Sequence, residues 1–250
     1  MRPEHVLLLG GTREARRAAR ALAARGLRVT YSLAGVTERP RLPVGASLRM
    51  GGFGGAEGLA AWIAAHDVSA VVDATHPYAA TMGRNAHDAA GMAGVPLVRL
   101  ERPAWRPRPG DRWIVVPTLE AAADVPPPQA RVVSWLGGRG LAALSGRGDL
   151  WLVARLVGGP SFTVPPRWRI LRGRPGRGVA GELALLRAVR ARLAVCRNSG
   201  GEPGRARVEA ARLLGVPVVM VARPERPPAP RARSIEELIH VLGAELSSSL

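Results

Sequence analysis

The stretch HVLLLGGTREARRAARALAARG, residues 5–26, indicates the fold most directly. Its first five residues form a short apolar run that ends in Gly10-Gly11-Thr12. Alanines and a leucine then recur at helical spacing from residue 13 to residue 25, and Gly26 ends the pattern. A short apolar strand, a glycine turn and a helix in this order are typical of the opening unit of a parallel α/β sheet.

The alternation of strands and helices continues along the chain. We expect strands at 28–33, 70–73, 131–136 and 193–196, and helices at 59–66, 79–93, 182–191 and 207–214. The sequence therefore predicts an α/β protein with doubly wound parallel sheets.

An internal repeat divides the chain into two similar halves. GVPLVRLERP at 94–103 matches GVPVVMVARP at 215–224, and each copy follows an alanine-rich helix. Helix–Gly-Val-Pro–strand connections are common in α/β proteins, but the shared closing Arg-Pro favours two related domains. RPRPG at 106–110 is a plausible hinge, which predicts one domain at 1–110 and another at 111–250.

Composition limits the class of protein. The chain has 250 residues, one cysteine and a formal charge of +17, and all its basic residues are arginines. A single cysteine excludes an intrachain disulfide and a cysteine-based metal site. The apolar opening is too short for a signal peptide, and no stretch has the length of a membrane span, so we expect a cytoplasmic protein without membrane contact. The basic surface attracts polyanions, but the arginines are scattered and form no nucleic-acid-binding module, so we expect no nucleic acid partner.

Glycine-rich loops after the first strands predict a dinucleotide site. Gly10–Arg13 lets backbone amides approach a pyrophosphate at a helix N-terminus, although a tight strand–helix turn explains it equally well. The second strand ends in Tyr31-Ser32-Leu33-Ala34-Gly35, without the carboxylate that usually binds the ribose of NAD, and this favours NADP. Arg39 is close enough in sequence to contact the 2′-phosphate. Gly51–Gly55, GGFGG, favours a cofactor contact over a flexible loop.

Two further loops carry candidate site residues. DATHPY at 73–78 follows a buried strand, so Thr75 and His76 are expected at the sheet edge, where a nicotinamide would lie; a structural role for His76 is equally open. Arg197–Gly201 holds the corresponding place in the second half and indicates an anion site, with a solvated loop as the alternative. No metal site is expected, because no second histidine or carboxylate pair stands at ligand spacing.

Six motifs, in order, resemble those of the precorrin-6A reductases, including the cobalt-precorrin-6A reductases. They are LGGTREA (9–15), SLAG (32–35), GGFGG (51–55), DATHPYA (73–79), ERPAW (101–105) and RNSGG (197–201). The resemblance covers nearly the whole chain. It implies two Rossmann-like domains, hydride transfer from NADPH to C19 of a tetrapyrrole with protonation at C18, and a transient contact with the next enzyme of the pathway.

The resemblance also implies the site residues. NADPH is expected on Gly10, Gly11, Thr12, Arg13, Ser32, Ala34, Gly35, Gly52, Phe53, Gly54, Thr75 and His76. The substrate carboxylates are expected on Arg139, Arg155, Arg172, Arg197, Asn198, Ser199, Gly200 and Arg207, since guanidinium groups bind carboxylates in a bidentate manner. Thr75, His76 and Tyr78 are the candidate catalytic residues, and Tyr78, His76 or a bound water could donate the proton to C18.

The resemblance further implies an exchange of strands, with 97–100 in the second sheet and 218–221 in the first. Two departures from the family pattern are Val36, where relatives often have arginine, and Arg174-Pro175, where relatives tend to have Pro-Phe. The alternatives are another NADP-linked reductase, disfavoured by the lack of a Tyr-x-x-x-Lys pair, and a non-enzymatic polyanion-binding protein, which leaves the glycine-rich loops unexplained.

Overall fold

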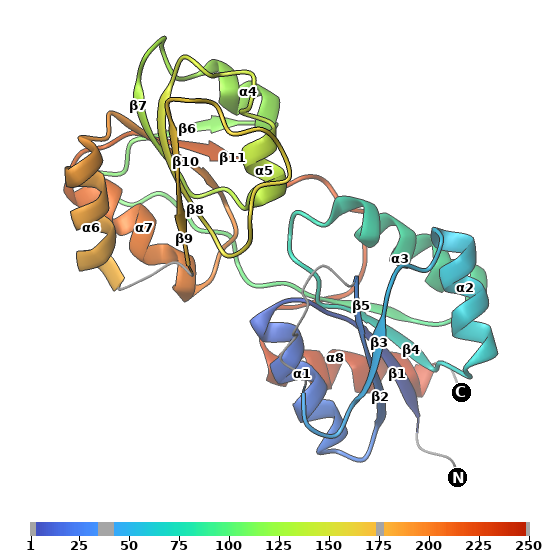
Figure 1. Cartoon of the computed structure of the whole chain (residues 1–250). Coiled ribbons are helices and arrows are strands. Elements are labelled where there is room, and N and C mark those ends of the chain that lie inside the picture. The colour runs from blue at the N-terminus through green and yellow to red at the C-terminus, as the bar shows by residue number, and fades with distance from the viewer. Residues whose placement is uncertain (1–3, 35–42, 174–177, 249–250) are drawn as a thin grey trace. The chain divides into compact units, whose positions relative to one another are not determined.

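The computed structural model describes residues 4–34, 43–173 and 178–248. The chain forms two compact units: unit 1 comprises Met1–Pro103 and Pro224–Leu250, and unit 2 comprises Ala104–Arg223. Each unit contains one six-stranded sheet in which every pairing is parallel (Figure 1). The predicted α/β fold with two doubly wound parallel sheets is confirmed.

The elements of unit 1 are β1 (His5–Leu9), α1 (Arg13–Ala23), β2 (Arg28–Leu33), β3 (Ser47–Met50), α2 (Ala56–Ala65), β4 (Ala70–Asp73), α3 (Ala80–Ala93), β5 (Leu97–Leu100), β12 (Arg231–Ala232) and α8 (Ile235–Ser248). Its strand order, β3-β2-β1-β4-β5-β12, is that of a dinucleotide-binding Rossmann sheet. The direction of winding reverses between β1 and β4, which makes their carboxyl ends the switch point where ligands bind in such sheets.

The elements of unit 2 are β6 (Trp113–Val116), α4 (Leu119–Asp124), β7 (Arg131–Ser134), α5 (Gly138–Ala142), β8 (Trp151–Leu156), β9 (Trp168–Arg172), α6 (Gly178–Val189), β10 (Leu193–Arg197), α7 (Glu202–Leu213) and β11 (Val218–Val221). The strand order is β9-β8-β7-β10-β11-β6, so the switch point lies between β7 and β10. The two sheets differ only in the sixth position, which the last strand fills in unit 1 and the first strand fills in unit 2.

The exchange predicted for 97–100 and 218–221 is wrong. β5 pairs with β4 through Val71 and Leu97, and β11 pairs with β10 through Ala194 and Val218, so each strand stays in its own sheet. The short turns at Gly94 and Gly215, both at positive φ, return each chain directly from its helix to the neighbouring strand position. The chain crosses between the units after each of these strands, so the strands that are exchanged are β6 and β12.

The predicted domain boundary at 110/111 is corrected in two places. The chain leaves unit 1 at Pro103, and it returns at Pro224 instead of ending in unit 2. β12 pairs with β5, and Leu238 and Leu242 of α8 are buried in the core of unit 1 with Leu22 of α1. Figure 1 shows the red helix α8 beside the blue helix α1. This apolar burial fixes the C-terminal segment in unit 1.

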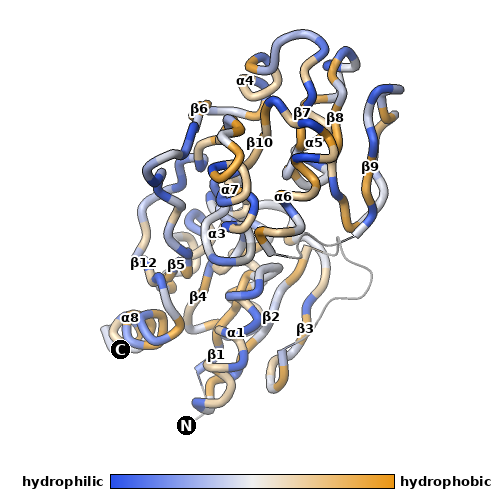
Figure 2. The backbone as a smooth tube through the Cα atoms, turned by 90° about the vertical axis from the view of Figure 1, so that its left-hand side faces the viewer, coloured by the Kyte–Doolittle hydropathy of each residue, from blue (hydrophilic) through white to orange (hydrophobic). Residues whose placement is uncertain are grey.

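Helices cover both faces of the sheet in unit 1, called sheet 1 below. The residues of α1 that face the sheet, Ala15, Ala18, Ala19 and Leu22, are buried at helical spacing, and their small size allows close packing. α2 and α3 cover the opposite face with Leu59, Ile63 and Ala86 among others. Figure 2 shows apolar stretches along the strands of both units. Within the described ranges, none of the helices combines the length and the apolar character that crossing a membrane would require.

Candidate active site

The loop after β1 is fixed by a buried tyrosine. A Cβ added to Gly10 would lie 2.4 Å from Cε2 of Tyr31, so only glycine fits at this position. The amide of Gly11 donates a hydrogen bond to Oη of Tyr31 over 3.1 Å, and Gly11 has a φ of 109°. Oγ1 of Thr12 accepts a hydrogen bond of 3.0 Å from the amide of Ala15 and caps α1. These contacts hold the N-terminus of α1 at the carboxyl end of β1.

The loops after β1, β4 and β5 converge at the switch point of unit 1. Oγ1 of Thr12 donates a hydrogen bond to the carbonyl of Ala74 over 2.9 Å, which joins the first two loops. Arg102 and Glu14 form an ion pair of 2.8 Å beside them. A small pocket lies here and is lined by Thr12, Glu14, Thr75, Pro77, Leu100, Glu101 and Arg102. The structure thus brings Thr12 and Thr75, two predicted site residues, to one pocket.

An arginine outside the predicted site residues holds the GGFGG loop. Arg49, on β3, donates hydrogen bonds to the carbonyls of Gly51 and Gly52 over 2.8 and 2.7 Å. Its guanidinium carbon lies 3.5 Å from the ring centroid of Phe53, a cation–π contact. Burial lowers the pKa of Arg49. Its only sequence signal is an arginine two residues before a glycine-rich loop.

The same loop has room for a ligand against its backbone. An added Cβ on Gly52, Gly54 or Gly55 would meet no atom within 4 Å, and Gly54 and Gly55 have φ values of 81° and 102°. α2 begins after Gly55 without a side-chain cap, which leaves its first amides available to an anion. These open glycines fit a dinucleotide that lies along the carboxyl edge of the sheet.

Residues at the end of β2 are only partly described. Ser32 is buried, its carbonyl accepts a hydrogen bond of 2.9 Å from the amide of Gly10, and Ala34 is exposed. Gly35, Val36 and Arg39 lie outside the described residues, as do Arg174 and Pro175 in unit 2.

A buried carboxylate anchors the loop after β4, which carries predicted site residues. Asp73 is fully buried, and its Oδ1 accepts hydrogen bonds from the amide and the hydroxyl of Thr75 over 3.1 and 2.6 Å. The amide of Tyr78 donates to Nδ1 of His76 over 3.3 Å. Neutral His76 therefore carries its proton on Nε2. Both rings, with centroids 5.7 Å apart, lie on this one turn.

The corresponding edge of unit 2 is formed by the loops after β7 and β10. Arg197 ends β10 and reaches α5, the short helix after β7, where its Nη2 would lie 3.0 Å from a Cβ on Gly140. Gly200 and Gly201 have φ values of 69° and 72° and lead into the N-terminus of α7. The predicted residues Ser199 and Gly200 thus lie where the two loops meet the helix.

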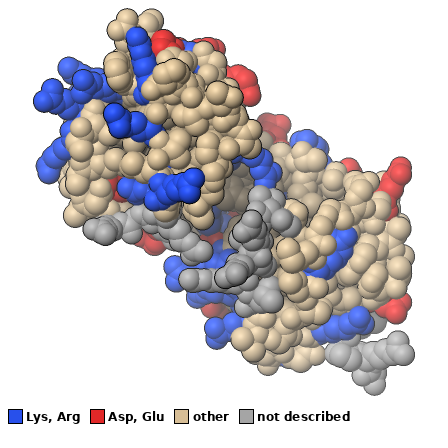
Figure 3. Space-filling view, in the orientation of Figure 1, with Lys and Arg blue, Asp and Glu red and all other residues tan. Residues whose placement is uncertain are grey.

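The predicted substrate arginines have different environments. Arg139 on α5 and Arg172 at the end of β9 are exposed, whereas Arg207 on α7 is half-buried. Nε of Arg207 is buried and has no hydrogen-bond partner among the described residues. The pairing of Leu156 with Arg172 in the β8–β9 register places Arg172 at the carboxyl edge of the sheet. Figure 3 shows arginines spread over the visible face of unit 2.

Arg155 is the exception among these arginines. Its Nη1 lies 3.1 Å from Oε1 of Glu182, which is 1% exposed, and the indole of Trp135 donates to Oε2 of the same carboxylate over 3.1 Å. The guanidinium of Arg155 thus neutralises a buried carboxylate inside the unit. No local pattern marks this pair, because its two members are 27 residues apart.

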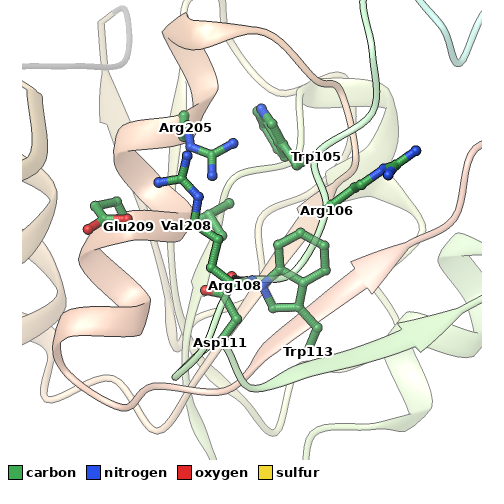
Figure 4. A pocket seen from close by; sticks show the side chains of 8 residues that line it. All are labelled: Trp105, Arg106, Arg108, Asp111, Trp113, Arg205, Val208 and Glu209. Atoms are coloured by element: carbon green, nitrogen blue, oxygen red, sulfur yellow. Dashed lines mark hydrogen bonds between the residues drawn. The ribbon is translucent and has the colours of Figure 1, made fainter.

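Asn198 holds the segment that enters unit 2. Its side chain accepts a hydrogen bond from the amide of Trp105 over 2.8 Å and donates one to the carbonyl of Trp105 over 3.0 Å. The indole of Trp105 donates to the carbonyl of Gly201 over 2.8 Å, and Gly204 leaves room for its ring. A small pocket continues along α7 (Figure 4), lined by Trp105, Arg106, Arg108, Asp111, Trp113, Arg205, Val208 and Glu209. Asn198 therefore joins the predicted anion loop to the incoming chain.

The single cysteine of the chain is unreactive in the folded protein. Cys196 is buried at the end of β10, and burial raises the pKa of its thiol to about 12, although the cations Arg207 and Arg197 act in the opposite direction. The thiol is therefore protonated at neutral pH and is a poor nucleophile.

Known proteins match this chain over nearly its whole length. The family model for precorrin-6x reductase CbiJ/CobK matches residues 5–243. A precorrin-6A reductase from Rhodococcus erythropolis is 47% identical over 226 residues, covering 90% of this chain and 91% of the relative. One from Mycobacterium tuberculosis (strain ATCC 25618 / H37Rv) is 43% identical over 224 residues, covering 89% and 90%.

A solved structure agrees with the sequence relatives. The structure of "CobK precorrin-6A reductase" is 37% identical, covers 97% of both chains and superposes with a TM-score of 0.88. The resemblance inferred from six motifs is confirmed, because the family model, the relatives and the solved structure all name the same family. The chain belongs to the precorrin-6x reductase family, the oxidoreductases CbiJ and CobK of cobalamin biosynthesis.

Proposed function

We propose that the chain reduces the macrocycle of precorrin-6A with NADPH, placing a hydride on C19 and a proton on C18. The observation that carries this proposal is the pocket at the switch point of unit 1, where loops after three neighbouring strands meet, in a chain of this family. The mode of ligand binding in doubly wound sheets supports a nicotinamide cofactor at this edge. Bound there, NADPH would supply the hydride.

The backbone of unit 1 would hold the cofactor. Gly10–Arg13 and Gly52–Gly54 offer glycines and helix N-termini to the phosphates, and Ser32 and Ala34 lie at the end of β2 towards the ribose. The described part of β2 and its exit, residues 28–34, contains no carboxylate that would bind a ribose 2′-hydroxyl. This supports NADPH over NADH.

The loop after β4 would complete the reaction centre. Thr75 has its hydroxyl proton directed to Asp73, so its oxygen offers an acceptor to the cofactor. His76 holds its proton on Nε2, the ring atom that does not face the amide of Tyr78. His76, Tyr78 and a bound water are the candidates for the donor of the proton to C18, and His76 could serve only from its imidazolium form, because a neutral imidazole would be left as an imidazolate.

The arginines of unit 2 would bind the carboxylates of the tetrapyrrole. Arg139, Arg172, Arg197 and Arg207 would supply guanidinium groups, and the amides at Ser199 and Gly200 would add donors. Arg155 is left out of this set because it is paired with Glu182. A cytoplasmic location and a transient contact with the enzyme that takes the product belong to the same proposal.

Gly52 allows a clean test of the cofactor site. A side chain fits at Gly52 without meeting protein atoms, and the same holds for Gly91 on the exposed face of α3. Gly52→Val should therefore fold normally but weaken NADPH binding at least about tenfold, because the side chain occupies the cofactor's space. Gly91→Val is the matched control and should bind NADPH as the parent does. Fluorescence titration with NADPH and NADH measures both variants.

The outcomes separate the alternatives. Equal NADPH affinity in Gly52→Val and the parent, or a cofactor bound at Arg197–Gly201, would overturn the cofactor assignment. An anaerobic assay with metal-free and with cobalt-bearing precorrin-6A then decides the reaction and the form of the substrate. A chain that oxidises NADPH with neither compound would be a different NADP-linked reductase.

A further inference from the structure

An arginine on the returning C-terminal segment lies against the loop after β4. Arg226, only two residues beyond the point where the chain re-enters unit 1, has a side chain that is 5% exposed. Its Nη2 forms a short hydrogen bond to Oδ2 of Asp73 and donates another to Oγ1 of Thr75 over 3.2 Å. These partners precede Arg226 by about 150 residues, so no local pattern announces the contact.

Asp73, Thr75 and Arg226 form a closed hydrogen-bonded ring. The hydroxyl of Thr75 donates to Oδ1 of Asp73, Arg226 binds Oδ2, and the same nitrogen of Arg226 binds the Thr75 oxygen. Each group thereby fixes the other two. The carboxylate alone would orient Thr75 through one oxygen, but the guanidinium holds both the carboxylate and the hydroxyl and so fixes the turn that carries His76.

Helix α3 leaves room for the guanidinium of Arg226. A Cβ added to Gly83 of α3 would lie 2.4 Å from both Nε and Nη2 of Arg226. Gly83 is buried in the interior of the helix, where glycine is unfavourable compared with alanine by about 1 kcal/mol. The close approach of Arg226 explains why glycine is present there.

The cluster holds more positive than negative charge. Arg99 on β5 is fully buried, and its Nε lies 3.6 Å from Oδ2 of Asp73, so one carboxylate faces two guanidinium groups. No nitrogen of the Arg99 side chain has a hydrogen-bond partner in the described part of the chain. Burial lowers the pKa of Arg99, and the neighbouring Arg226 cation lowers it further. A net positive charge therefore lies beneath the strand end where we place an anionic cofactor.

We infer that Arg226 is a positioning residue for NADPH, which acts by holding the Thr75–His76 turn in its binding geometry. This inference rests on the proposed function of unit 1. It makes the segment that follows unit 2 part of the cofactor site. The glycine-rich loops and strand ends of the nucleotide-binding pattern do not include any residue of that segment.

The test compares Arg226→Met with Arg233→Ala, a control on the same returning segment whose side chain is exposed. Arg226→Met should weaken NADPH binding at least about tenfold and lower kcat, because the turn loses its fixed position. Guanidinium ion at a non-denaturing concentration should restore part of the affinity to Arg226→Ala, which leaves a cavity of matching shape. Arg233→Ala should bind NADPH as the parent does.

A double-mutant cycle gives the readout that a purely structural role would not move. If Arg226 acts through the turn, Thr75→Ala and Arg226→Met should each weaken NADPH binding, and the double variant should be little worse than either. Should Arg226→Met fail to fold, Gly83→Ala takes its place, since the added methyl group displaces the guanidinium and keeps its charge.

The results distinguish this inference from the proposed function. Parental NADPH affinity in Arg226→Met, or in Gly83→Ala, would overturn the role of Arg226 while leaving NADPH binding by unit 1 intact. Additive effects in the cycle would overturn it as well, because they would mean that Arg226 acts independently of Thr75. A parent chain that binds no NADPH would overturn both proposals.

Discussion

The pair formed by Arg155 and Glu182 allows a quantitative prediction. Resemblance to the family predicts that Arg155 binds substrate, whereas the structure directs its guanidinium to a carboxylate that is 1% exposed. Removal of one partner of a buried ion pair costs about 3–5 kcal/mol. The Arg155 side chain is 23% exposed, which reduces this figure, and we expect Arg155→Met to lower the stability of unit 2 by about 2 kcal/mol.

The reverse substitution should cost a similar amount. Glu182→Leu leaves both the guanidinium of Arg155 and the indole N–H of Trp135 without their acceptor. The double variant should be less destabilised than the sum of the two single variants, because neither charge is then left alone. For a unit of this size, 2 kcal/mol corresponds to a fall in melting temperature of about 8 °C.

Thermal unfolding and steady-state kinetics together decide between the two roles. Arg155→Met should melt earlier but keep the parental KM for the tetrapyrrole, and Arg139→Met, at an exposed arginine, should melt as the parent does. The reasoning is refuted if Arg155→Met keeps its stability and raises KM about tenfold. Such a result would mean that Arg155 leaves Glu182 to bind substrate.

Three other predictions concern the two units separately. Arg197→Ala and Arg207→Ala should each raise KM for the substrate about ten- to a hundredfold with unchanged NADPH affinity, and unchanged KM in both would place the substrate elsewhere. Cys196, whose thiol pKa burial raises to about 12, should resist iodoacetamide at pH 8 in the native protein and react after denaturation; equal rates would contradict its burial. Burial lowers the pKa of His5, which is hydrogen-bonded to Thr30, below the ordinary histidine value of 6.5, so the unfolded chain binds more protons. Stability should therefore be full above pH 6.5 and fall as the pH drops below it, and a His5→Gln variant should lose that part of the dependence in thermal melts.

Local sequence patterns were enough to predict the first elements. The apolar run predicted β1 at 5–9, as found, and helical spacing predicted α1 at 13–25, close to Arg13–Ala23. Glycine positions also carried information, because a tight approach such as that of Gly10 to Tyr31 tolerates no other residue. These features depend on neighbours within one strand–helix unit, which is why a single sequence predicts them.

Features that depend on distant parts of the chain could not be predicted in this way. β12 is two residues long and has no apolar run, so nothing local marks it as the sixth strand of sheet 1. The exchange that the resemblance implies names the wrong strands, and the sequence offers no check, because β5 and β11 are alike and side-chain pattern alone does not say which sheet a strand joins. Arg49, Glu182 and Arg226 were missed for a related reason, since each is defined by the side chains or carbonyls that folding brings to it.

The two units are completed in different ways, because each sheet takes its sixth strand from a different part of the chain. Unit 2 is one continuous segment and closes its sheet with β6, which precedes its other strands. Unit 1 needs residues from both ends of the chain, because β12 and the buried Leu238 and Leu242 of α8 come from the segment after unit 2. The same segment brings Arg226 to Asp73. The loops of sheet 1 that we assign to the cofactor are therefore fully supported only when the chain has returned from unit 2, so that one C-terminal segment completes both the core of unit 1 and its site.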